Sequence, residues 1–168
     1  MTAVGAGLVL AWAAHDAEEL LTMAPTSQAV LSALPSTLPI PPHLREDGLS
    51  QRHVNLAIGL MALPVAAAAI RGMCTGGRSR WFRGAVRAFG AHGITHIGSS
   101  LAASRYTTGV VTAPLIVLPY WARARRALLR HGLDGIDPAT AVKALSIVPI
   151  TVGAHVAAAM ILRGEHQR

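Results

Sequence analysis

Long apolar stretches alternate with short polar ones along the chain, and five of the apolar stretches approach the length of a membrane-spanning helix. A bilayer helix needs about 20 consecutive apolar residues. The second and fourth stretches are short and need flanking residues to complete a span. The stretches cover residues 3–22, 54–70, 84–104, 108–122 and 141–162. This pattern predicts an all-α fold, a polytopic membrane bundle of about five transmembrane helices.

Prolines help to place the ends of these predicted helices. A proline-rich loop, Pro25 to Pro42, separates the first two stretches. Within it, residues 26–34 favour a short amphipathic helix on the membrane surface. Asp137 followed by Pro138 is typical of a helix N-cap and first helical position, so the last helix is expected to start there.

Composition agrees with a single membrane domain, residues 1–168. Hydrophobic residues make up 52% of the chain and charged residues 14%, whereas soluble domains have about 25% charged residues. The net charge of +7 lies mostly in two short loops without an aromatic-rich basic surface, so nucleic acid is not an expected partner. The single cysteine, Cys74, excludes an internal disulfide and a cysteine metal cluster.

The distribution of arginines predicts the orientation of the helices. Arginines cluster in residues 71–87 and 123–130. In a five-helix arrangement these two loops lie on the same side, which the positive-inside rule makes cytoplasmic. We therefore expect a multi-pass protein of the cell (inner) membrane, with a cytoplasmic N-terminus and an extracytoplasmic C-terminus. Membrane lipids are its expected partners.

The first predicted helix contains the segment HDAEE at residues 15–19, with one imidazole and three carboxylates. An ionised side chain deep in a bilayer costs about 2.5–3.5 kcal/mol, so such groups usually face a protein interior and have a function. Positions i, i+3 and i+4 share one side of a helix. His15, Glu18 and Glu19 are therefore expected to converge, while Asp16 points elsewhere.

A second polar stripe is expected on the third predicted helix, where His92, His96, Ser99 and Ser100 follow helical spacing. Counted along their helices, His15, His96 and His155 of the fifth helix fall at a similar level in the outer half of the membrane. Imidazoles at i and i+4, with a carboxylate from another helix, are typical of divalent metal sites in helix bundles. The predicted metal ligands are His15, Glu18, Glu19, His92, His96 and His155.

The segment at residues 15–19, together with HGITHIGSSLAASRYTTGVVTA at residues 92–113, resembles the HXXEE-domain family of small, mainly bacterial integral membrane proteins. The matching positions of the second block are His96, Ser100, Arg105-Tyr106 and residues 107–109. The chain departs from the family pattern at Thr108, where a proline is usual, and at His92, where an asparagine is usual. The resemblance implies a membrane fold and supplies no established activity.

Three functions fit these patterns, and the first is a membrane metalloenzyme. One or two divalent ions, iron or zinc, would act on a lipid or another apolar small-molecule substrate. Glu18, Glu19 and Tyr106 are the predicted catalytic residues. The predicted substrate-binding residues are Trp12, Asn55, Ser99, Ser100 and Arg105.

The two alternatives need no metal. One is an acid–base isomerase or cyclase of an isoprenoid-like substrate, in which burial keeps one glutamate protonated. The other is a non-enzymatic proton or ion carrier or a membrane scaffold, for which a homo-oligomer is expected because five helices make a small pathway. Glu18, Glu19 and His155 each also have a structural explanation that needs no functional site. Glu18 and Glu19 could lie near the outer interface and be solvated. His155 could be a core histidine that is hydrogen-bonded to a backbone carbonyl.

Overall fold

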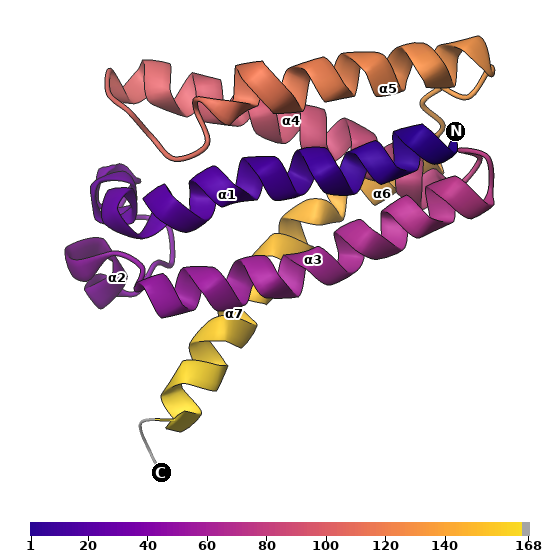
Figure 1. The fold of residues 1–168 in the computed structure, drawn as a ribbon. Coiled ribbons are helices and arrows are strands. Elements are labelled where there is room, and N and C mark those ends of the chain that lie inside the picture. The colour runs from indigo at the N-terminus through magenta and orange to yellow at the C-terminus, as the bar shows by residue number, and fades with distance from the viewer. Residues whose placement is uncertain (166–168) are drawn as a thin grey trace.

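The computed structural model describes residues 1–165, which fold as a bundle of helices (Figure 1). No strand occurs in this part of the chain, so the all-α prediction is confirmed. The elements are α1 (Thr2–Ala33), α2 (Pro42–Asp47), α3 (Gln51–Cys74), α4 (Arg80–Ala103), η1 (Ala113–Val117), α5 (Leu118–Arg130), α6 (Pro138–Leu145) and α7 (Ile147–Glu165). Of these, η1 is a π-helical segment that leads directly into α5.

Two helix boundaries differ from those the sequence predicts. Helix α1 continues through Pro25 to Ala33, so residues 26–34 do not form a separate surface helix. Near the proline, Thr22 and Thr26 each donate a hydrogen bond from the side chain to the backbone carbonyl four residues earlier. Side-chain hydroxyls of this kind help a helix to tolerate a proline. The fourth apolar stretch begins in a loop at residues 104–112 and becomes helical only at residue 113.

The expected start of the last helix at Asp137 and Pro138 is confirmed. The Asp137 side chain accepts a hydrogen bond from the Thr140 amide, and Pro138 is the first residue of α6. The hydrogen bond to Asp137 and the proline, which has no amide proton, both lower the number of unpaired amides at the start of α6. The helix is then divided at Ser146 into α6 and α7.

Two helical stretches within residues 1–165 are long and apolar enough to cross a membrane. They are α3 and the stretch Pro138–Arg163, which joins α6 to most of α7. Only a small part of the second stretch is buried inside the protein. Length and composition thus support a membrane location, while the arrangement of five spans stays a prediction.

Small residues let the long helices approach one another closely. A Cβ atom on Gly5 of α1 would lie 2.5 Å from Met73 Cγ and 3.0 Å from the carbonyl oxygen of Ala69, both on α3. On α4, a Cβ atom on Gly90 would lie 2.4 Å from the indole ring of Trp121. Close packing of this kind holds helices together when apolar surroundings offer little hydrophobic driving force.

One end of the bundle gathers segments that are far apart in sequence. The N-terminus, the α3–α4 turn and the α5–α6 connection lie together at this end, opposite α2 (Figure 1). A Cβ atom on Gly77 would lie 2.5 Å from Met1 Cε and 3.5 Å from Leu133 Cδ1, which places the three segments in contact. Both arginine-rich segments are therefore at the same end of the molecule.

Candidate metal centre

Helix α1 carries two of the four side chains that converge at the candidate centre. His15 and Glu19 lie about one helical turn apart, so they project from the same side of α1. That side continues the buried row of Leu8 and Ala11. His15 is 0% exposed and Glu19 is 5% exposed. The apolar pattern of α1 thus directs an imidazole and a carboxylate into the protein interior.

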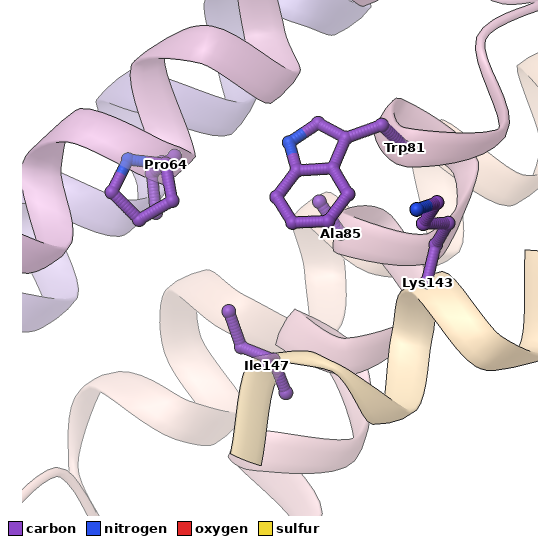
Figure 2. A pocket seen from close by; sticks show the side chains of 6 residues that line it. Pro64, Trp81, Ala85, Lys143 and Ile147 are labelled. Atoms are coloured by element: carbon purple, nitrogen blue, oxygen red, sulfur yellow. The ribbon is translucent and has the colours of Figure 1, made fainter. Parts of the chain in front are cut away.

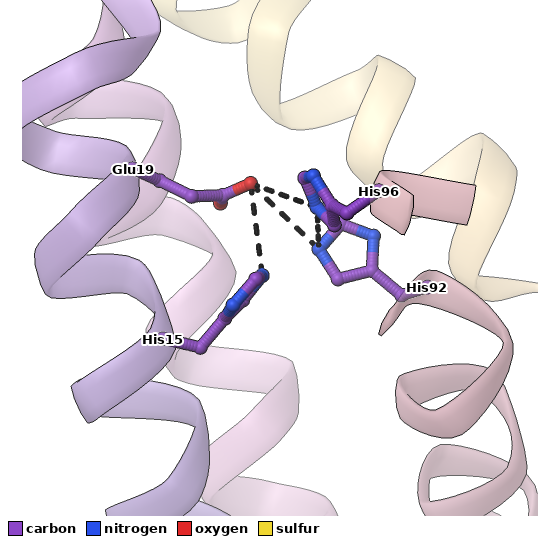
Figure 3. A group of neighbouring side chains, drawn as sticks. All are labelled: His15, Glu19, His92 and His96. Atoms are coloured by element: carbon purple, nitrogen blue, oxygen red, sulfur yellow. Dashed lines mark hydrogen bonds and ion pairs between the residues drawn. The ribbon is translucent and has the colours of Figure 1, made fainter. Parts of the chain in front are cut away.

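Helix α4 supplies two more imidazoles, from His92 and His96, again about one turn apart. Figure 3 shows that the three rings and the Glu19 carboxylate point toward one another. Glu19 Oε1 lies 3.2 Å from His96 Nε2 and 3.8 Å from the Nε2 atoms of His15 and His92. One ligand atom from each of the four residues lies within 4.8 Å of the others, so the group could hold a metal ion.

The loop at residues 104–112 contacts the back of two of these rings. His96 Nδ1 lies 2.6 Å from the carbonyl oxygen of Thr108, and His15 Nδ1 lies 2.7 Å from Thr112 Oγ1. Gly109 fits between the rings, because a Cβ atom there would lie 2.6 Å from His96 Nδ1 and 2.9 Å from His15 Cε1. Its φ of 77° also favours glycine. The loop therefore orients both rings with Nε2 toward Glu19.

The hydrogen bonds around His96 leave a surplus of acceptors at the centre. A carbonyl oxygen only accepts, so His96 carries a proton on Nδ1, and in a neutral ring Nε2 is then an acceptor. This Nε2 lies 2.9 Å from His92 Nε2 and 3.2 Å from Glu19 Oε1. An unprotonated nitrogen and a carboxylate oxygen repel each other at this distance. Either a second proton on His96 or a metal ion held by the group balances the charge.

His15 shows the same surplus more clearly. Its Nε2 is buried and has no hydrogen-bond partner among the residues that the structure describes. A buried polar atom without a partner costs about 1–3 kcal/mol. Because this atom faces Glu19 at 3.8 Å, a cation between them would satisfy both groups.

Glu18, the neighbouring glutamate, lies outside this group of four. Its carboxylate faces the loop, where Oε1 accepts from the Tyr106 hydroxyl at 2.6 Å and from the Val111 amide at 3.3 Å. Oε2 accepts from the amide of Thr112 at 2.7 Å and from its hydroxyl at 2.6 Å. Glu18 is therefore bound to the loop that supports the centre.

The structure brings His15, Glu19, His92 and His96 together and places His155 elsewhere. His155 Nδ1 lies 3.0 Å from His53 Nε2 on α3, and the two rings are stacked. Its predicted role as a ligand stays a prediction. Asp16, expected to point elsewhere than His15, Glu18 and Glu19, lies outside the group of four and is buried at 5% exposure.

The predicted substrate-binding residues do not form one group, although Ser100 and Arg105 are in contact. Trp12 packs against the hydrophobic core, and Asn55 is exposed on α3, where it accepts a hydrogen bond from Gln51. Ser99 is exposed on α4. The Ser100 hydroxyl donates to the carbonyl of Arg105, whose guanidinium donates to the carbonyl of Ala29. Their roles in substrate binding stay predictions.

Two residues of the loop that orients the rings, Thr112 and Gly109, were not predicted from the sequence as part of the centre. Thr112 is one of several threonines in the segment, and no local pattern distinguishes it. Gly109 between two threonines and an apolar run is a recognisable turn signal, which would have placed a loop before the fourth helix. The His53–His155 pair joins two helices far apart in sequence, so no spacing rule could reveal it.

A small cavity lies between α3, α4 and the junction of α6 and α7 (Figure 2). Its volume is about 20 Å³, which is room for roughly one water molecule. Trp81 lines it, and the Lys143 ammonium lies 5.6 Å from the centre of the Trp81 ring. The remaining lining residues are Pro64, Val65, Ala85 and Ile147. This space is too small for an organic substrate.

Comparison with known proteins yields one match. The sequence model of a family described as "protein of unknown function with HXXEE motif" matches residues 6–124. The matched segment includes α1 from residue 6 onward, all of α3 and α4, and the loop that supports the centre. No curated protein and no solved structure matches the chain.

Proposed function

We propose that this chain, which belongs to the HXXEE family, is a membrane-embedded enzyme that depends on a divalent metal ion. The observation that supports this proposal is the convergence of one carboxylate and three imidazoles within 4.8 Å of one another. Two of the rings have their Nδ1 atoms bonded to the loop, which leaves their Nε2 atoms directed at Glu19. Such secondary hydrogen bonds are typical of metal-ligating histidines.

The ligands in this proposal are Nε2 of His15, His92 and His96, and Oε1 of Glu19. Three imidazoles and a carboxylate suit zinc or iron better than magnesium or calcium, which prefer oxygen ligands. A metal ion bound there would polarise a substrate bond or activate water. In this proposal Glu18 supports the loop, and Tyr106 and Arg105 of the same loop would bind a polar head group.

His92 gives the proposed centre its open side. Its side chain is 44% exposed, whereas those of Glu19 and His96 are 7% and 12% exposed. Val111, next to Thr112 in the loop that supports the centre, is also exposed. An exposed apolar side chain beside the open side of the centre supports a lipid or another apolar molecule as the substrate of this proposal.

A metal-free acid–base enzyme is the second candidate, because a proton on His96 satisfies the contact with Glu19 as well as a metal ion does. The contact of 3.2 Å between His96 Nε2 and Glu19 Oε1 fits a charged hydrogen bond. In that case the pair would move a proton to or from an isoprenoid-like substrate.

Metal-dependent turnover tests the proposal and separates the two candidates. The purified full chain, loaded with Zn²⁺ or with Fe²⁺ under exclusion of oxygen, is incubated with a total membrane lipid extract and analysed by mass spectrometry. We expect a product with the loaded protein and with the control variant Glu46→Gln, whose side chain is exposed on α2. Glu19→Gln should give none. A product formed equally by the metal-free protein favours the acid–base enzyme, and no product under any condition contradicts both.

The single cysteine offers a test of the proposed membrane orientation. Cys74 is exposed at the arginine-rich end of the bundle, which we place in the cytoplasm. A membrane-impermeant maleimide should therefore label it only after cell lysis. In the control protein, Cys74→Ala combined with Ser36→Cys moves the thiol to an exposed position between α1 and α2, at the opposite end. Labelling of intact cells is expected there, and labelling of Cys74 in intact cells would contradict the orientation.

A further inference from the structure

The two adjacent glutamates of the HXXEE motif have different surroundings. Glu19 faces three imidazoles, whereas Glu18 faces the loop at residues 104–112. Four donors converge on the Glu18 oxygens, two backbone amides and the hydroxyls of Tyr106 and Thr112. A carboxylate that accepts this many bonds is held in its ionised form. Glu18 is thus a fixed negative charge behind the loop.

The hydroxyl of Thr112 connects this charge to the metal centre. A hydroxyl has one proton to donate, and Thr112 Oγ1 donates it to Glu18 Oε2 at 2.6 Å. Toward His15 Nδ1, 2.7 Å away, the same oxygen can therefore only accept. It follows that His15 carries its proton on Nδ1.

The location of this proton determines what the other side of the ring can do. A neutral imidazole protonated on Nδ1 has a lone pair on Nε2. That atom is buried, has no partner among residues 1–165, and faces Glu19. The opposite tautomer would place a proton on Nε2, so this atom would have no lone pair to offer a metal ion.

We infer that Glu18 and Thr112 are positioning residues, which fix His15 as the Nδ1–H tautomer and so keep its Nε2 available to a metal ion. This inference rests on the proposed metal centre. It assigns the two glutamates of the motif different tasks, since Glu19 contacts the ion and Glu18 acts through Thr112 and His15.

The tautomer of His15 can be measured without any metal. In the metal-free, ¹⁵N-histidine-labelled full chain at a pH where His15 is neutral, two-dimensional NMR distinguishes Nδ1–H from Nε2–H rings, and the loss of signals in His15→Ala assigns the residue. We expect the Nδ1–H form in the unsubstituted protein and in Thr112→Ser, which keeps the hydroxyl. Thr112→Val should shift His15 toward the Nε2–H form. An Nε2–H ring in the unsubstituted protein would overturn the inference, whether or not any variant folds.

Metal affinity supplies the second readout, by competition of Zn²⁺ or Co²⁺ with a chelator. We expect Thr112→Val and Glu18→Gln to weaken binding by about 10- to 100-fold, the usual effect of removing such a supporting group. Thr112→Ser, which keeps the hydroxyl, should bind the metal within about threefold of the affinity of the unsubstituted protein. The matched controls Thr151→Val on α7 and Glu46→Gln on α2 lie away from the loop and should bind as the unsubstituted protein does.

The two readouts separate failure of this inference from failure of the proposed function. If the unsubstituted chain binds no metal but His15 is the Nδ1–H tautomer and responds to Thr112→Val, the metal proposal fails and the positioning by Thr112 stands. If metal binds and Thr112→Val changes neither tautomer nor affinity, the metal proposal stands and the positioning fails.

Discussion

The arginine-rich end of the bundle and the candidate metal centre both bring charged groups together, but only the first gives each of its carboxylates a permanently charged partner. At the arginine-rich end, Asp134 pairs with Arg87 and Arg125, at 3.3 and 2.7 Å. Asp137 pairs with Arg80 and Arg83 at the same end, each at 3.1 Å. Every acceptor in these pairs faces a permanent cation. At the candidate metal centre, one carboxylate faces three imidazoles that are neutral unless protonated.

This difference separates a structural network from a binding site. In the arginine–aspartate network both carboxylates are paired with arginines, and the network ties α4 to the connection between α5 and α6. Its one buried atom without a partner in the described part of the chain, Arg83 Nε, is a donor on a side chain that is already charged. The His–Glu centre has more acceptors than donors, and one of them, His15 Nε2, has no partner within the described part of the chain. A network that lacks only a positive charge is suited to take one from outside. Substitutions at the metal centre should therefore lower metal affinity, whereas substitutions in the arginine–aspartate network should lower the free energy of unfolding and leave metal affinity unchanged.

Removing the carboxylate of the metal centre should have the largest effect on binding. In Glu19→Gln the central anion is replaced by an amide, so we expect metal affinity to fall by more than about 100-fold. The measurement is competition for Zn²⁺ between the purified chain and a chelator. The matched substitution in the arginine–aspartate network, Asp134→Asn, should leave affinity unchanged. Equal loss in both variants would show that binding depends only on global folding.

Gly109→Ala should damage both the centre and the fold. The added Cβ atom would lie 2.6 Å from His96 Nδ1, at a φ of 77°. We expect the free energy of unfolding to fall by about 1–3 kcal/mol and metal affinity to fall with it. Gly132→Ala is the control, because its φ is 68° but no atom lies within 4 Å of its Cβ position. Denaturant titration of both variants checks this, and equal losses would contradict a packing role for Gly109.

Asp134→Asn should lower stability without affecting metal binding. The Asp134 side chain is 5% exposed and accepts from two arginines, so the substitution weakens two charge-assisted hydrogen bonds. We expect a loss of about 2 kcal/mol in the free energy of unfolding. Asp47→Asn, on the exposed surface of α2, is the control and should change little. Denaturant titration in detergent measures both, and an unchanged Asp134→Asn protein would contradict the structural role.

The smallest expected effect is a dependence of stability on pH at Asp137. The Thr140 hydroxyl bond, helped by the Thr140 amide, Arg80 and Arg83, lowers the pKa of Asp137 from 3.8 to about 2. Because the folded pKa is below the unfolded one, the stabilisation is present above about pH 4 and is lost as pH falls toward about 2. Asp137→Asn should remove this part of the acid sensitivity. Melting temperatures of both proteins between about pH 2 and 5 check it, and parallel curves would contradict the assignment.

Sequence patterns within a single helix predicted much of the fold. They failed for residues whose position depends on contacts between segments far apart in the sequence. Apolar periodicity indicated the long helices, and the Asp137–Pro138 pair indicated the start of α6. Helical spacing also paired His15 with Glu19, although it grouped Glu18 with them. The loop determines that difference, since only the fold shows that Thr112 donates to Glu18. Likewise, equal depth along helices grouped His155 with His15, whereas helix packing places it against His53.

The most direct test of the central claim is X-ray absorption spectroscopy at the metal edge of the zinc-loaded full chain. The account predicts about one zinc per chain with nitrogen and oxygen ligands at about 2.0–2.2 Å. It also predicts the outer-shell scattering of three imidazole rings, reduced to two in His92→Ala. A folded chain that takes up no stoichiometric zinc, or one that binds it with oxygen ligands alone, would contradict a centre made of His15, Glu19, His92 and His96.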